Sequence, residues 1–192
     1  LWRDLKNFVP TGDFTLGKPL KKFEESFAKL IGTKYAVGVN SGTDAIKLSL
    51  KVLGVKNGDE VITAANTFVA TIGAIQELGA KPVFVDCDDS FCMNVSQVEQ
   101  KITKKTKAIV PVHFTGYMTD MVILSKISKK YKVPIVEDAC QSILGSINKK
   151  KAGTWGEFGA FSLHPLKNIN VWSDGGIITT NNFKFFKKLL LL

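Results

Sequence analysis

Two patterns of hydrophobic residues alternate along the chain: apolar residues at helical spacing, and short continuous apolar runs. Leu20, Phe23 and Phe27 fall at helical spacing, which predicts a helix over Pro19–Leu30. Short apolar runs such as Tyr35–Val39 predict buried strands. The other predicted strands are Glu60–Ala64, Pro82–Val85, Ala108–Val112, Val133–Val136, Gly159–Ser162 and Gly176–Thr180. The other predicted helices run from Ser41-Gly42-Thr43 to Gly54, from a cap at Asn66 or Thr67 to Gly79, over Val95–Ile102, over Asp120–Tyr131, and in the tail Phe183–Leu192.

This alternation of strands and helices predicts an α/β fold, with a mostly parallel central sheet and helices on both of its faces. We expect residues 19–192 to form one domain and residues 1–18 to be an incomplete N-terminal segment. In such sheets, ligands bind outside the carboxyl ends of the strands. Three polar or aromatic segments follow predicted strands there: Ser41–Thr43, Thr67-Phe68 and the segment that contains Asp138.

Composition narrows the class of protein. The chain is 45% hydrophobic and 22% charged, which is typical of a globular domain. No apolar run approaches the ~20 residues that span a bilayer, and the first residues are too polar for a signal peptide. The three cysteines show no CxxC spacing and the two histidines form no metal-binding motif, so we expect reduced thiols, no metal and a cytoplasmic location.

The net charge of +9 raises the question of nucleic-acid binding. Among the 26 basic residues, Arg3 is the only arginine, although base readout and bidentate phosphate contacts rely on arginine. The lysines cluster in polar stretches without interleaved aromatic residues. We therefore interpret them as solvated surface and expect no nucleic-acid partner.

Lys167 and Asp138 are the residues that point to a particular chemistry. Lys167 follows an apolar strand with a serine and precedes two adjacent glycines, so it can form a Schiff base with a carbonyl group. Asp138 ends a predicted buried strand and needs a cationic partner there. These are the two protein groups that pyridoxal 5′-phosphate (PLP) requires, a lysine for the aldehyde and a carboxylate for the pyridinium nitrogen. The alternatives are a surface lysine and a carboxylate paired with another lysine.

Other residues near these strand ends suit the rest of that cofactor. Gly42 and Thr43 open a helix whose amides and dipole favour a phosphate, and Ser162 offers a further hydroxyl. A plain helix cap is the alternative for the first two. Phe68 could stack on a flat ring or belong to the core. Gln141, one helical turn beyond Asp138, could reach a ring hydroxyl.

These segments together resemble the DegT/DnrJ-type nucleotide-sugar aminotransferases, which are fold-type I PLP enzymes. The resemblance runs from about residue 17 to residue 182. The segments that carry it are Asn40–Ala45 (NSGTDA), Asn66–Thr71 (NTFVAT), Pro82–Asp86 (PVFVD), Val112–Gly116 (VHFTG), Glu137–Gln141 (EDACQ), Phe161–Asn168 (FSLHPLKN) and Asp174–Gly176 (DGG).

The resemblance implies a role for each of these candidates. In that family the lysine, here Lys167, bonds the cofactor, and the aspartate, here Asp138, holds the pyridine nitrogen. The glutamine contacts the ring hydroxyl and the aromatic residue stacks on the ring, here Gln141 and Phe68. The phosphate-binding residues correspond to Gly42, Thr43 and Ser162.

The resemblance also implies a function: transfer of an amino group, with glutamate the expected donor, to a keto-sugar linked to a nucleotide. Some relatives that lack the lysine act as dehydratases, so the presence of Lys167 favours transamination. Family members are about twice as long, so we expect the C-terminal small domain to be absent here and the full-length protein to be a homodimer. The alternatives are another fold-type I reaction on an amino acid, a non-catalytic PLP- or sugar-sensing regulator, and an inactive fragment.

Overall fold

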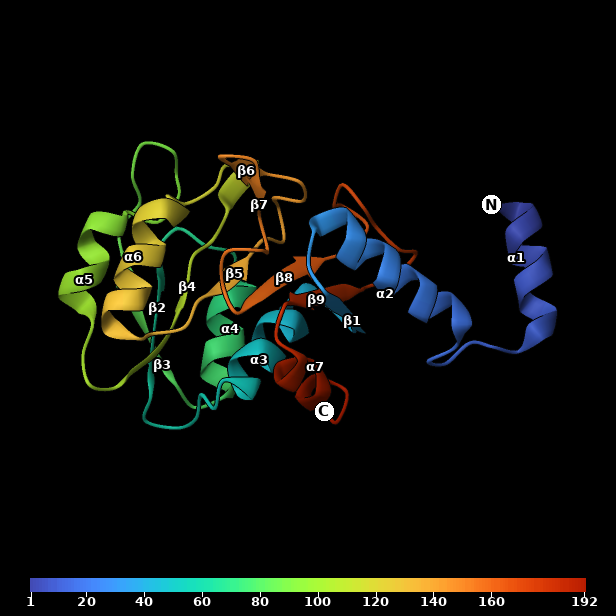
Figure 1. The fold of residues 1–192 in the computed structure, drawn as a ribbon, viewed down its shortest axis with the longest axis horizontal. Coiled ribbons are helices and arrows are strands. Elements are labelled where there is room, and N and C mark those ends of the chain that lie inside the picture. The colour runs from blue at the N-terminus through green and yellow to red at the C-terminus, as the bar shows by residue number, and fades with distance from the viewer.

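The structure, a computed structural model, describes residues 1–192 as helices packed around a central β-sheet (Figure 1). The α-helices are α1 (Trp2–Phe8), α2 (Lys18–Ile31), α3 (Gly42–Val52), α4 (Val69–Glu77), α5 (Val98–Lys101), α6 (Met121–Tyr131) and α7 (Phe183–Leu189). Short 3-10 helices cover Val9–Thr11, Val95–Gln97 and Phe114–Gly116. The strands are β1 (Tyr35–Val39), β2 (Glu60–Ala64), β3 (Lys81–Val85), β4 (Thr106–Val110), β5 (Val136–Asp138), β6 (Ser146–Ile147), β7 (Lys150–Lys151), β8 (Phe158–Ser162) and β9 (Gly176–Thr180).

The central sheet has two parts that continue into each other. One part has the order β3-β2-β4 and is parallel; the other has the order β5-β8-β9-β1. Parallel bridges join β4 and the residues after it to β5, between Ile109 and Ile135 and between Val112 and Asp138. Strand β9 runs antiparallel to both of its neighbours, β1 and β8. The predicted mostly parallel α/β sheet is therefore confirmed.

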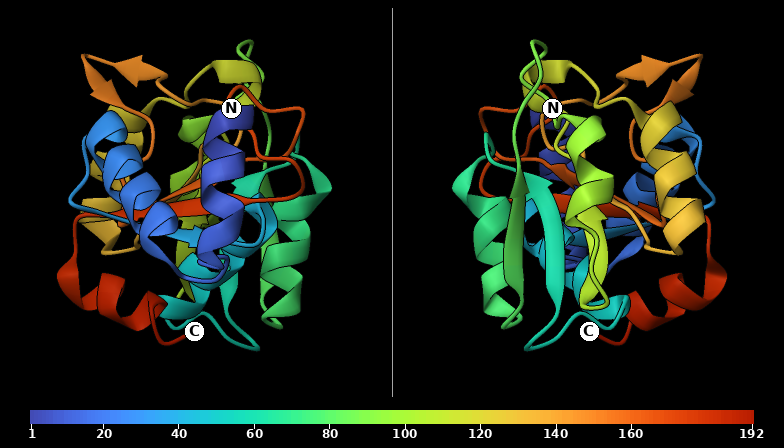
Figure 2. Two further views of the ribbon diagram at one scale, coloured as in Figure 1. Left: turned by 90° about the vertical axis from the view of Figure 1, so that its right-hand side faces the viewer. Right: turned by 90° about the vertical axis from the view of Figure 1, so that its left-hand side faces the viewer.

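Helices cover both faces of this sheet, as the alternation of side chains along the strands requires. On one face α3, α4 and α7 pack on a core that contains Val61, Val110 and Val136. The neighbouring strand residues Ile62 and Ile109 point to the opposite face, where α5 and α6 cover them. In the right-hand view of Figure 2, α4 lies on one side of β2 and β3, and α5 and α6 lie on the other. Helix α2 covers the second half of that opposite face.

Several boundaries differ from the sequence-based expectations. The strand expected over Val133–Val136 lies over Val136–Asp138, so Asp138 is within it. The segment 95–102 splits into a 3-10 turn and a single α-helical turn. Neither α1 nor the β6–β7 hairpin was expected. Helix α1 buries none of its residues and lies apart from the other elements (Figure 1).

One expectation about the helices needs correction. The expected cap of α4 at Asn66 or Thr67 is wrong: the N-cap is Phe68, and no side chain caps this helix. The expected tail helix is present as α7, which buries Leu189 and stacks Phe185 on Phe158, with ring centroids 5.2 Å apart, while Phe183 and Leu190 stay exposed. No helix in the chain combines the length and the apolar character that crossing a membrane demands.

Candidate active site

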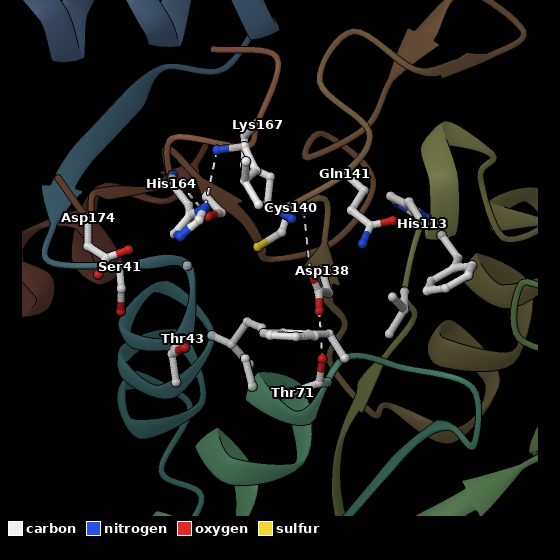
Figure 3. A pocket seen from close by; sticks show the side chains of 18 residues that line it. Ser41, Thr43, Thr71, His113, Asp138, Cys140, Gln141, His164, Lys167 and Asp174 are labelled. Carbon is white, nitrogen blue, oxygen red and sulfur yellow. Dashed lines mark hydrogen bonds between the residues drawn. The ribbon is translucent and has the colours of Figure 1, made fainter. Parts of the chain in front are cut away.

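A cavity of about 320 Å³ opens where β5 and β8 end and where α3 and α4 begin (Figure 3). This is the edge at which parallel α/β sheets bind ligands. All seven residues singled out from the sequence line this cavity: Gly42, Thr43, Phe68, Asp138, Gln141, Ser162 and Lys167. The structure thus brings the candidates together, and their individual roles stay predictions.

Asp138 lies at the end of β5 and is 5% exposed. Its Oδ2 accepts a hydrogen bond from Thr71 Oγ1 at 2.7 Å, and its Oδ1 accepts one from the backbone N–H of Cys140 at 3.2 Å. No lysine, arginine or histidine forms an ion pair with it. A carboxylate offers about four lone-pair positions. Asp138 is therefore a buried acceptor with capacity for a cationic donor, and the alternative of a lysine partner does not hold.

The adjacent carboxylate, Glu137, points to the opposite face of the strand, as expected from the alternation of side chains. It is fully buried and accepts four hydrogen bonds. The donors are the backbone N–H groups of Gly153, Trp155 and Gly156 and the ring Nε2 of His113, at 2.6–3.0 Å. Glu137 does not line the cavity. Its contacts hold the 153–156 turn against the sheet, a structural role that the sequence did not indicate.

The start of α3 comes unusually close to β8 and β9. A Cβ atom on Gly42 would lie 2.7 Å from Ser162 Cβ, and one on Gly176 would lie 2.2 Å from the carbonyl oxygen of Ser41. Ser41 Oγ accepts from the N–H of Asp44 and not from the N–H groups of Gly42 and Thr43. Those two N–H groups, in the first turn of the helix, remain free at the cavity. The N-terminus of α3 with Ser162 beside it thus forms a site suited to a phosphate group.

Lys167 lies in the loop between β8 and β9, in a turn where its N–H donates to the carbonyl oxygen of His164 at 2.8 Å. Its side chain is half-buried, lines the cavity and forms neither an ion pair nor a hydrogen bond with another residue. Lys47 and Lys130, by contrast, each pair with a glutamate. The amine of Lys167 is therefore free to react within the cavity.

Phe68 and Gln141 contribute from two other segments. Phe68 is 66% exposed at the start of α4, so it is not a core aromatic residue and its ring is free to cover a ligand. Gln141 lies in a turn rather than the expected helix. Its Oε1 accepts from the N–H of Thr115 at 2.8 Å. Because that contact fixes the amide, the NH₂ group of Gln141 remains as a donor.

Six further residues with polar side chains line the cavity without a role assigned to them from the sequence: Ser41, Thr71, His113, Cys140, His164 and Asp174. Thr71 and His113 belong to segments that carried the family resemblance, but nothing in the sequence links them to Asp138 or Glu137. Burial raises the pKa of the Cys140 thiol well above its ordinary value; the negative charge of Asp138 adds to this shift and Lys167 opposes it. The thiol is therefore neutral at physiological pH.

These groups fit PLP, a flat ring that carries a phosphate and a cationic nitrogen. The buried carboxylate without a cation suits the ring nitrogen, and the free amides of α3 suit the phosphate. Phe68 suits the face of the ring, and the free amine of Lys167 suits the aldehyde.

Comparisons with known proteins agree with this arrangement. The sequence profile of the DegT/DnrJ/EryC1/StrS aminotransferase family matches residues 2–192. The pleiotropic regulatory protein of Geobacillus stearothermophilus is 42% identical over 98% of this chain and 51% of its own length. The dTDP-3-amino-3,4,6-trideoxy-alpha-D-glucose transaminase of Micromonospora megalomicea subsp. nigra is 40% identical over 90% of this chain and 46% of its own length.

Solved structures give the same result. NtdA from Bacillus subtilis with bound cofactor PMP is 38% identical, with a TM-score of 0.93 over 98% of this chain and 42% of that one. The chain spans about half the length of the curated relatives that it matches.

Proposed function

We propose that this chain, which belongs to the DegT/DnrJ/EryC1/StrS aminotransferase family, binds PLP in the cavity and transfers an amino group from an amino acid to a nucleotide-linked keto-sugar. Glutamate is the first donor to test. One observation carries the proposal. Lys167, with a free amine, and Asp138, buried without a cation, line the same cavity. The transaminase from Micromonospora, named for a dTDP-linked amino sugar, supports the substrate class.

Each residue then has a defined task. Bound PLP supplies an electron sink for breaking a bond to the α-carbon of the amino donor. Lys167 would hold the cofactor through its amine, and the same amine would accept the proton lost from that α-carbon. Asp138 accepts a hydrogen bond from the ring nitrogen and keeps it protonated.

The remaining cavity residues orient the cofactor. Phe68 stacks on the ring, and the amide NH₂ of Gln141 donates to the ring hydroxyl. Gly42, Thr43 and Ser162 bind the phosphate through two backbone amides and the two hydroxyl groups.

The phosphate assignment has its own test. Ser162→Ala and Thr43→Val each remove one hydroxyl group, so we expect weaker binding of PLP than of pyridoxal in relation to the unchanged protein. Equal weakening of both compounds would mean that the phosphate binds elsewhere.

The amino-transfer reaction can be tested in two halves on the full-length protein. PLP should produce a visible absorbance band, and glutamate should abolish it while 2-oxoglutarate appears. A nucleotide-linked keto-sugar should restore the band and yield an amino-sugar detected by mass spectrometry. A protein that binds PLP but leaves glutamate and other amino acids unchanged would refute aminotransfer.

A non-catalytic regulator is the second candidate, because one relative at 42% identity carries the name pleiotropic regulatory protein. The same experiment separates the two candidates. A regulator would bind PLP or the sugar without turnover, whereas an aminotransferase would complete both halves.

The assembly and the location are also part of the proposal. We propose that residues 19–192 are the cofactor-binding domain of a cytoplasmic homodimer whose partners are the sugar and the amino donor, with no nucleic acid or membrane involved. Light scattering of the full-length protein should give the mass of a dimer, and a monomer that completes both halves of the reaction would contradict it.

A further inference from the structure

A chain of hydroxyl groups ends on Asp138. Thr71 Oγ1 donates to Asp138 Oδ2 at 2.7 Å, and Thr71 Oγ1 also lies 2.8 Å from Thr67 Oγ1 (Figure 3 shows the first contact). An ionised carboxylate can only accept, so the single proton of the Thr71 hydroxyl is committed to Asp138. Thr67 must therefore be the donor to Thr71. The two hydroxyl groups point in one direction, from Thr67 through Thr71 to Asp138.

This use of a helical threonine is unusual within the chain. Hydroxyl residues inside helices commonly donate to the carbonyl oxygen four residues earlier. Ser49 in α3 does so, with its Oγ 2.7 Å from the carbonyl oxygen of Ala45. Thr71, equally buried in α4, contacts the side chain four residues earlier and a carboxylate 67 positions away in sequence.

Burial makes the orientation of this carboxylate depend on donors from the protein. Thr71 is 0% exposed and Asp138 is 5% exposed, so protein groups supply most of the contacts that hold the carboxylate. The Thr67 hydroxyl polarises that of Thr71 and strengthens its bond to the carboxylate. Together with the N–H of Cys140 on Oδ1, Thr71 fixes the plane and direction of the carboxylate.

We propose that Thr71, with Thr67 behind it, is a positioning residue that orients Asp138 to accept a hydrogen bond from the ring nitrogen of the cofactor. This inference rests on the proposed function. It assigns the threonine that ends the NTFVAT segment a task separate from that of Phe68, three residues before it on the same helical turn.

A cofactor analogue separates positioning from mere packing. In 1-deaza-pyridoxal phosphate a C–H group replaces the ring nitrogen, so it has no hydrogen bond to Asp138. In the full-length protein stripped of cofactor, Thr71→Val should raise the Kd for PLP about tenfold and the Kd for the deaza analogue less than about twofold. Thr71→Ser should retain most of the PLP affinity, because it keeps the hydroxyl group.

The controls make each result decisive. Ser49→Ala removes a buried helical hydroxyl remote from Asp138 and should leave both affinities unchanged. Thr67→Val should weaken PLP binding in the same selective way by a smaller factor, and it decides the question if circular dichroism shows that Thr71→Val is unfolded. Equal weakening of PLP and the analogue, or no weakening of either, overturns the inference. An unchanged protein that binds no PLP overturns the proposed function instead.

Discussion

Replacing Glu137 by glutamine should destabilise the fold far more than its single lost charge suggests. Glu137 Oε1 accepts from the N–H groups of Trp155 and Gly156, and Oε2 accepts from Gly153 N–H and His113 Nε2. A glutamine has one acceptor oxygen and one NH₂ group. Whichever way the amide turns, two buried donors face the NH₂ group and lose their acceptor.

His113 cannot compensate for the lost acceptors by changing its tautomer. Its Nδ1 accepts from the N–H of Thr119 at 3.3 Å, which makes Nε2 the protonated nitrogen. Moving the proton to Nδ1 would set two donors against each other at Thr119. At about 1.5–3 kcal/mol for each hydrogen bond to a charged group, two lost bonds predict a decrease of about 3–6 kcal/mol in the free energy of unfolding. That is a large part of the roughly 5–15 kcal/mol that stabilises a typical domain.

The measurement is urea unfolding followed by circular dichroism, with Glu157→Gln as the matched control. Glu157 accepts one backbone N–H, from Ile135 at 2.7 Å, and a glutamine keeps that acceptor. We expect the control to lose less than about 1 kcal/mol. If Glu137→Gln and Glu157→Gln differ by less than about 1 kcal/mol, the four-bond account of Glu137 is wrong.

Asp138→Asn, unlike Glu137→Gln, should change the stability of the fold little and PLP binding strongly. The asparagine oxygen can accept from Cys140, and its NH₂ group can donate to Thr71, whose hydroxyl then turns to donate to Thr67. Because the two hydroxyl groups can reverse direction, the fold should lose little stability. PLP binding should weaken strongly, since a cationic ring nitrogen no longer faces a carboxylate. Comparable losses of stability in Asp138→Asn and Glu137→Gln would argue against this division.

Three further predictions concern other parts of the site. Borohydride reduction of the PLP-loaded protein should attach the cofactor to Lys167, and a peptide map with the label on another lysine would refute the central assignment. Gly176→Ala should destabilise the domain, because its Cβ would lie 2.2 Å from the backbone of Ser41. Gly73→Ala lies in a helix and its Cβ would have no atom within 4 Å, so its free energy of unfolding in urea should rise by about 0.5–1 kcal/mol. Similar effects of the two changes would contradict the close approach. Because its pKa is raised, Cys140 should react slowly with iodoacetamide at mildly alkaline pH, and rapid labelling in a peptide map would contradict the neutral thiol.

Local patterns were sufficient to predict most of the sheet. The strands Tyr35–Val39, Glu60–Ala64 and Gly176–Thr180 have the expected bounds, because short apolar runs between turn residues leave few alternatives. The candidates at strand ends also lie together as the parallel topology requires. The hydrogen bond between Thr71 and Asp138 and the four bonds to Glu137 were not predictable, since they join segments far apart in sequence.

The start of α4 shows why one local rule failed. The capping rule favours a polar residue, and Asn66 and Thr67 both precede the apolar helix. Neither caps it, because the Thr67 hydroxyl bonds with Thr71 and the N-cap position belongs to the exposed Phe68. A helix that gives up its cap loses roughly 0.5–2 kcal/mol. We attribute that loss to the site: the same turn presents an aromatic ring to the cavity and a hydroxyl group to Asp138, and a conventional cap at Thr67 would divert the hydroxyl that orients Thr71.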